Sequence, residues 1–198
     1  LPRATPITIG IVAGEASGDA LAAGLISHVR ARNPAIRFAG IAGPKMQAAG
    51  CDVLFPLERL AVRGFVEVLA HLPALVRIRR ELARMLLTQR IPLFVGVDAP
   101  DFNLGLEHKL KRRGVRTIHY VSPSVWAWRG DRVQTIARSA DRLLALFPFE
   151  PAIYRATPVA VDFVGHPLAA AAATPASRRQ TRDVLKLKPS TPVFALLP

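Results

Sequence analysis

The sequence contains a single cysteine, Cys51, in 198 residues, which excludes an intramolecular disulfide framework and indicates a reducing compartment. No apolar run approaches the roughly 18 residues that span a bilayer, so no transmembrane helix is expected. The five histidines are scattered without paired ligand spacing, and a metal site is therefore not predicted. Nucleophile-elbow, P-loop and GxGxxG motifs are absent, as are known DNA- and RNA-binding signatures.

Acidic residues are scarce as well. The chain has 14 Asp and Glu against 27 Lys and Arg, for a formal net charge of +13. This imbalance predicts a polyanionic neighbour, which could be nucleic acid, an anionic membrane surface or a phosphorylated substrate. Charge alone does not choose among the three.

What the chain does have is a regular alternation of apolar strand-like runs and helical patterns, typical of a Rossmann-like, doubly wound, mostly parallel α/β sheet. Ligands bind such sheets beyond the carboxyl ends of the strands, where connections diverge. Strands are predicted at 7–13, 37–41, 53–55, 93–97, 117–121, 143–147 and 161–164. Helices are predicted at 18–32, 45–49, 65–72, 73–88, 102–113, 129–140 and 150–156, with Pro73 in a first turn.

The pattern changes after His166-Pro167. An Ala-rich linker is predicted at Leu168–Pro175, a short helix at Arg178–Leu185 and an apolar strand at Val193–Leu197. We therefore expect one domain over residues 1–167, and over 168–198 a linker with the first elements of a second α/β domain.

The segment Gly14–Asp19 joins the first strand to its helix, and its small residues would let a ligand approach a helix N-terminus. One interpretation is an ordinary tight turn with Ser17 or Asp19 as N-cap. The other is a binding site, in which the two acidic side chains favour sugar hydroxyls over a phosphate.

Asp98 follows the strand at 93–97, where its carboxylate either faces the crevice and accepts a proton or stabilises the turn as an Asx residue. Asp101 is placed to cap the following helix, which also carries Asn103. Off the next strand, the loop from Ser122 holds both tryptophans, Trp126 and Trp128. It forms either a wall of the substrate cleft or a loop folded onto the core.

Residues 60–90 combine dense apolar positions with a helix whose arginines lie opposite its apolar arc. This helix either packs on the sheet with a solvated basic face or contacts a membrane interface. The membrane interpretation assigns that contact to Val62, Phe65, Val66, Leu69, Arg77, Arg80 and Arg84.

Six segments together resemble the lipid-A-disaccharide synthase family, which consists of inverting glycosyltransferases of the two-domain GT-B architecture. The resemblance runs from Ile7 to Pro198. It is strongest in Ile11–Asp19, Phe38–Cys51, Gly96–Asn103, His119–Arg129, Ala145–Glu150 and Phe163–Leu168. Arg63 departs from the family, which usually has an apolar residue there.

The resemblance implies that UDP-2,3-diacylglucosamine is joined to 2,3-diacylglucosamine 1-phosphate, giving the β-1,6-linked disaccharide 1-phosphate and UDP. Asp98 would be the general base, and Glu15 and Ser17 would line the acceptor side. The expected substrate-binding set is completed by Gly14, Asp101, Asn103, Ser122 and Trp126.

The resemblance further implies no metal and no cofactor. It places the protein in the cytoplasm, peripheral on the anionic inner-membrane surface, and a homodimer of the full-length protein is considered. The UDP-binding half would lie mostly beyond Pro198, so residues 1–198 alone are expected to be inactive.

Two alternatives stay open at this stage. One is another GT-B-like enzyme acting on UDP-sugars, such as a relative of UDP-N-acetylglucosamine 2-epimerase, although the stretch His119–Arg129 argues against it. The other is a basic α/β module that binds anionic membrane or RNA without catalysis.

Overall fold

The computed structural model describes residues 7–60, 65–125, 130, 132–172 and 178–196, with the side chains of 65–71 and 170–172 outside that description. The chain divides into two compact units, Leu1–Gly165 and His166–Pro198. The first unit is built on a sheet, and the described part of the second contains helices without strands.

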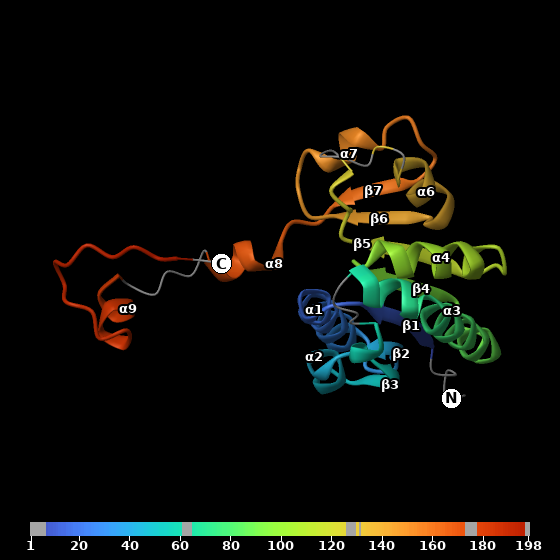
Figure 1. Cartoon of the computed structure of the whole chain (residues 1–198), viewed down its shortest axis with the longest axis horizontal. Helices are drawn as coiled ribbons and strands as arrows, with labels where there is room; N and C mark the ends of the chain where they lie inside the picture. Colours follow the sequence, from blue (N-terminus) through green and yellow to red (C-terminus); the bar gives the residue numbers. More distant parts are fainter. Residues whose placement is uncertain (1–6, 61–64, 126–129, 131, 173–177, 197–198) are drawn as a thin grey trace. The chain divides into compact units, whose positions relative to one another are not determined.

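The sheet of the first unit has seven parallel strands in the order β3-β2-β1-β4-β5-β6-β7 (Figure 1). Their bounds are β1 Thr8–Ala13, β2 Arg37–Ala42, β3 Cys51–Pro56, β4 Leu93–Val97, β5 Arg116–Tyr120, β6 Arg142–Ala145 and β7 Ala160–Phe163. All seven strands predicted for residues 1–167 are present, and the predicted α/β class is confirmed. The chain moves outward from β1 to β3 and then returns to place β4 on the other side of β1.

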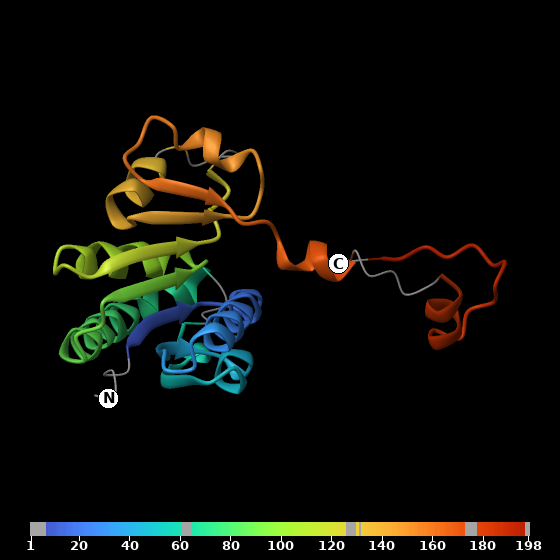
Figure 2. The same ribbon diagram turned by 180° about the vertical axis from the view of Figure 1, so that it is seen from behind.

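Helices cover both faces of this sheet (Figures 1 and 2). The helices α1 (Ala16–Arg32) and α2 (Pro44–Ala48) lie on one face, and α3 (Phe65–Thr88), α4 (Pro100–Lys111) and α6 (Arg132–Ser139) on the other. The short helices η1 (Leu57–Arg59) and α7 (Glu150–Ile153) follow β3 and β6. Because both faces are covered, alternate residues of β1 are buried on opposite sides: Ile11 packs with the α1 cluster and Val12 with the α3–α4 cluster.

The helix α3 differs from the prediction. Two helices were predicted at 65–72 and 73–88, but one helix spans both ranges with Pro73 inside it. An interior proline costs about 3 kcal/mol, and the preference for a first turn is a weak prior that packing overrides. The predicted amphipathic pattern is confirmed for its carboxyl half: Ile78, Leu82 and Leu86 are buried.

Residues 168–172, predicted as part of a linker, belong to a helix, α8 (Pro167–Ala172), because alanine has the highest helix propensity and Pro167 suits a first position; 173–175 lie outside the described residues, and the linker role stays a prediction. The predicted strand of the second unit is wrong. Val193–Leu196 form no strand, and Phe194 is 95% exposed. A strand needs a partner, and none exists among the described residues of this unit. The predicted helix is present as α9 (Arg178–Val184).

Candidate functional site

The switch point of the sheet lies between β1 and β4, which are hydrogen-bonded neighbours with Ala13 opposite Val97. The chain leaves these two strands in opposite directions, and ligands of open α/β sheets bind where such connections diverge. The two loops touch: a Cβ on Gly14 would lie 2.3 Å from the Cβ of Ala99. Glycine at position 14 is therefore required for the close approach of the loops that carry Glu15 and Asp98.

Asp98 occupies the predicted place at the tip of β4, in an unusual backbone conformation. Its φ is +52° and that of Ala99 is +43°, both in the left-handed region that non-glycine residues seldom adopt. Val121, directly after the neighbouring strand β5, has a φ of +81°. The Asp98 N–H donates to the Tyr120 carbonyl at 2.8 Å, so the loop after β4 is tied to the end of β5. Backbone strain of this kind clusters at functional sites.

Asn103 is hydrogen-bonded to the same loop. This residue is fully buried in α4, and its amide donates to the carbonyl oxygens of Val97, at 3.3 Å, and Asp98, at 2.8 Å. Such a position makes Asn103 a support for the Asp98 loop; its predicted contact with substrate stays a prediction.

A buried polar cluster beside Asn103 was missed by the sequence reasoning. Glu107 of α4 and His119 of β5 are both fully buried, and their side chains are hydrogen-bonded at 2.7 Å between Oε1 and Nδ1. A Cβ on Gly96 would lie 2.1 Å from that Glu107 oxygen, so glycine makes room for the pair. The spacing could have revealed the cluster, because Asn103 and Glu107 are four residues apart on one helix face and His119 shares a strand face with Thr117.

The helices α1 and α4 both begin at the switch point without a side-chain cap. Their N-caps are Glu15 and Ala99, and not Ser17, Asp19 or Asp101, so the capping interpretations of those three residues are wrong. The prediction failed because α1 and α4 each start two residues before the predicted start. The positive dipole ends of both helices and the uncapped first turn of α1 therefore face this edge of the sheet, whereas the Phe102 and Asn103 N–H groups of α4 donate to the Ala99 carbonyl.

Of the acidic pair in the first loop, only Glu15 is exposed, together with Ser17. Asp19 is 2% exposed and accepts hydrogen bonds from the backbone N–H groups of Gly43, Lys45 and Met46, at 2.9, 3.0 and 3.1 Å. It caps α2 instead of facing a ligand. Of the two acidic side chains predicted to reach sugar hydroxyls, only that of Glu15 is therefore available.

Asp101 lies in the first turn of α4 with its side chain 86% exposed and forms an ion pair with Arg132 at 2.6 Å. Ser122 is buried, and its hydroxyl is hydrogen-bonded to that of Tyr154 at 2.8 Å. Burial raises the pKa of Tyr154, with a further rise from nearby Glu150 partly opposed by the Ser122 hydrogen bond. Trp126 lies outside the described residues.

Exposed aromatic rings at the ends of the outer strands were also missed. Phe147 and Phe149 follow β6, stack with centroids 5.7 Å apart, and are 46% and 48% exposed. Phe163, at the end of β7, is 52% exposed. The carboxyl edge of the sheet thus presents apolar surface at β6 and β7, two and three strands from β4 at the switch point, and exposed patches of this kind mark interaction surfaces.

The predicted membrane-contact residues are only partly described. Arg77, Arg80 and Arg84 are exposed on α3, opposite its buried face, and Leu72 and Val76 add exposed apolar surface. Val62 and the side chains of Phe65, Val66 and Leu69 lie outside the described residues. No described helix has the length and apolar character needed to cross a membrane.

Solved structures share this fold at low sequence identity. MurG from Acinetobacter baumannii matches 82% of the chain, and 46% of its own length, with a TM-score of 0.53 and 11% identity. The UDP complex of Arabidopsis thaliana UGT89C1 matches 85% of the chain, and 54% of its own length, with a TM-score of 0.51 and 14% identity. The fold is that of one half of a GT-B glycosyltransferase.

Sequence comparison is more specific. The family described as lipid-A-disaccharide synthetase matches residues 9–198. The lipid-A-disaccharide synthases of Methylobacillus flagellatus and Chromobacterium violaceum are 54% and 53% identical over 96% and 99% of this chain. The chain spans about half the length of these curated relatives, 50% and 51%. Neither alternative left open by the sequence gains support from these matches, and the chain belongs to the lipid-A-disaccharide synthase family.

Proposed function

We propose that this chain forms the acceptor-binding half of an inverting hexosyltransferase of lipid A biosynthesis. The enzyme would join UDP-2,3-diacylglucosamine to 2,3-diacylglucosamine 1-phosphate, giving the disaccharide 1-phosphate and UDP. Family membership supports the reaction class. The observation that carries the site is Asp98, held in a left-handed conformation at the β1–β4 switch point.

Asp98 would act as general base. Its carboxylate takes the proton from the acceptor 6-hydroxyl as that oxygen forms a bond to the anomeric carbon of the donor. The bond from the anomeric carbon to UDP breaks on the opposite side, so the configuration inverts and UDP leaves with the electron pair. The hydrogen bonds from Asp98 N–H to Tyr120 and from Asn103 to the Asp98 carbonyl fix the backbone, which orients the carboxylate before reaction.

The residues around Asp98 would bind the acceptor. Glu15 is exposed in the loop whose Gly14 touches Ala99, and Ser17 is exposed in the first turn of α1, which has no side-chain cap. A carboxylate and a hydroxyl suit sugar hydroxyl groups, and free helix N–H groups suit a phosphate. The stacked pair Phe147 and Phe149 supplies apolar surface on the same edge of the sheet, which suits acyl chains.

The test is the substitution Asp98→Asn in a chain that joins residues 1–198 to the carboxyl half of the Chromobacterium violaceum relative. Turnover should fall about 10²–10⁴-fold, the usual contribution of a positioned base, while the KM for the acceptor changes little. The matched control is Asp52→Asn, which removes an exposed carboxylate from β3 and should leave turnover within twofold. Turnover of Asp98→Asn within twofold of the parent would remove Asp98 from the base role.

We also propose that the protein is cytoplasmic and peripheral on the anionic face of the inner membrane, through Val62, Phe65, Val66, Leu69, Arg77, Arg80 and Arg84. Support comes from the exposed arginines of α3 and from Leu72 and Val76, which are 45% and 37% exposed beside them. Apolar side chains inserted near cations that meet lipid headgroups would hold such a helix at the interface. A homodimer of the full-length protein remains part of this proposal.

Vesicle sedimentation tests the membrane contact. Binding of the chain to vesicles with anionic lipid should weaken when Leu72→Glu or Phe65→Glu is introduced, and should weaken further at high salt because exposed charges are screened. Val53→Glu, which places the same charge on a 37%-exposed residue of β3, is the control. If all three variants sediment like the parent, α3 is a core helix with a solvated face.

A further inference from the structure

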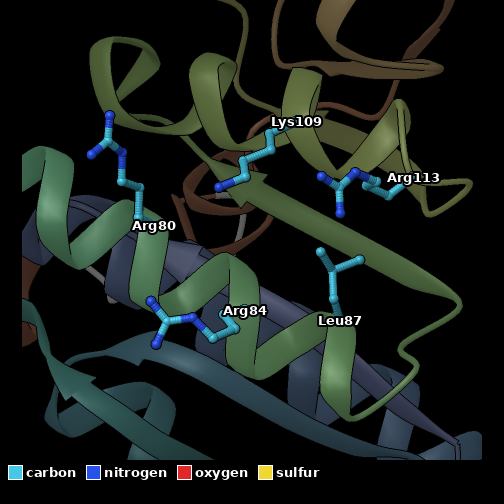
Figure 3. Close-up of a pocket in the computed structure, with 5 residues that line it drawn as sticks. All are labelled: Arg80, Arg84, Leu87, Lys109 and Arg113. Atoms are coloured by element: carbon cyan, nitrogen blue, oxygen red, sulfur yellow. The ribbon is translucent and has the colours of Figure 1, made fainter.

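A groove between α3 and α4 gathers four cations away from the switch point. Its lining consists of Arg80, Arg84 and Leu87 from α3, Lys109 from the last turn of α4 and Arg113 from the turn that follows α4, around a cavity of about 270 Å³ (Figure 3). No carboxylate is among these lining residues. Because helices in this fold run opposite to the strands, the carboxyl halves of α3 and α4 lie at the edge where strands begin, opposite the edge of Asp98.

The spacing of these cations is unfavourable for the folded chain alone. Arg80 and Arg84 are four residues apart on α3, and like charges at this spacing repel on a helix. The dipole of α4 compensates Lys109 in its last turn, but Arg80 and Arg84 lie inside α3, about a turn or more from its last residue. Within the described part of the chain none of the four forms an ion pair.

Arg79 shows how a structural arginine on the same helix behaves. Its guanidinium lies 5.0 Å from the ring centre of Phe102 and donates to the Asp101 carbonyl at 2.8 Å. The groove cations lack such partners among the described residues. A neighbouring hollow of about 350 Å³ is also lined by Arg80 and Arg84, but its lining includes the carboxylate of Glu81. The lining of the groove contains no carboxylate.

We propose that this groove binds a phosphate monoester. Arginine presents a planar fork of N–H donors that matches phosphate oxygens, and lysine adds a point charge. A monoester carries close to two negative charges at neutral pH, enough to relieve the repulsion among the four cations. Leu87 points from α3 toward Arg113 and offers apolar contact to the carbon that bears the phosphate (Figure 3). If the monoester is a lipid headgroup, this inference depends on the membrane contact proposed above. If it is a free phosphate, the inference is independent of that contact.

The test uses the 198-residue chain and two probes. Inorganic phosphate is titrated at low ionic strength and followed by amide chemical shifts. Vesicles of phosphatidylcholine with phosphatidic acid are compared with vesicles of phosphatidylcholine with phosphatidylglycerol at matched charge. The groove variant is Lys109→Gln with Arg113→Gln. The control is Arg138→Gln with Arg155→Gln, which removes the same charge from exposed residues elsewhere in the first unit.

The proposal is supported if phosphate binds saturably and its affinity falls at least tenfold in the groove variant but less than twofold in the control. A preference for phosphatidic acid that the groove variant loses identifies a lipid headgroup as the source; equal binding to both vesicles identifies a free phosphate. Equal losses in groove and control variants, or no saturable phosphate binding, would overturn the proposal. Neither result bears on Asp98, whose test measures turnover.

Discussion

At the scale of single residues, the buried pair of Glu107 and His119 lies against Gly96, two residues before Asp98. Glu107 Oε2 and His119 Nε2 have no hydrogen-bond partner among the described residues, and neither does the buried Asn103 Oδ1. Burying polar groups in this way costs free energy, so the pair is sensitive to the loss of either member.

The substitution His119→Ala should lower the free energy of unfolding by about 3–5 kcal/mol, because it leaves the Glu107 carboxyl buried without its partner. Urea unfolding of the 198-residue chain measures the change. Glu107→Gln keeps an oxygen acceptor for His119 and should cost no more than about 1.5 kcal/mol. Equal losses in the two variants would show that the hydrogen bond does not explain the effect.

For single residues, the sequence predicted some positions correctly and missed the partners of others. The place of Asp98 followed from the strand rule, because a buried run ending in a polar residue marks a strand tip. The bonding of Asp19 did not, since its three N–H donors come from Gly43, Lys45 and Met46, more than twenty residues away. Ser122 likewise pairs with Tyr154, and no local pattern encodes such a long-range contact.

At the scale of elements, Asp141 joins α4 to the sheet. Its carboxylate accepts from the Thr117 N–H at 2.9 Å, at the start of β5, and pairs with Lys111 of α4 at 3.0 Å. Burial acts to raise the pKa of Asp141, but the hydrogen bonds from Thr117 and Lys111 and the charge of Lys111 outweigh it and hold the pKa below its usual value.

A folded-state pKa below the unfolded value stabilises the chain above the unfolded pKa, and that contribution disappears as the pH falls through the folded pKa. Asp141→Asn should therefore cost stability at pH 7, no more than about 1 kcal/mol because the side chain is 44% exposed, and almost nothing in strong acid. Urea unfolding from pH 7 to 2 tests this. A difference that stays constant over the whole range would contradict the role of the carboxylate.

The elements themselves were largely predictable, because burial on both faces makes parallel strands read as continuous apolar runs. All seven strands follow from this pattern. The unbroken helix α3 did not follow, since the local rule for Pro73 gave way to packing of Ile78, Leu82 and Leu86 on the sheet. The strand predicted at Val193–Leu197 failed for the opposite reason: an apolar pattern forms a strand only where a partner strand exists.

At the scale of the whole molecule, the described part of the second unit has no buried side chain and no strand. The sequence predicts that residues 168–198 hold a linker and only the first elements of a second, UDP-binding domain, and the described residues of α8 and α9 provide no enclosed surface for a nucleotide. Calorimetry of the 198-residue chain should therefore detect no micromolar binding of UDP. The chain joined to the carboxyl half of the Chromobacterium violaceum relative is the positive control. A micromolar Kd for the 198-residue chain would move the donor site into the first unit.

The position of β1 inside the sheet has a consequence for synthesis on the ribosome. Its partner β2 follows after α1, and β3 pairs with β2, whereas β4, which pairs with the other edge of β1, follows only after α3. Until β4 emerges, the N–H and C=O groups along that edge of β1 have no partner, and an open edge strand invites pairing with other chains. The nascent protein thus passes through a stage in which three of its seven strands can pair and an open edge invites aggregation, and that stage lasts at least as long as translation of α3.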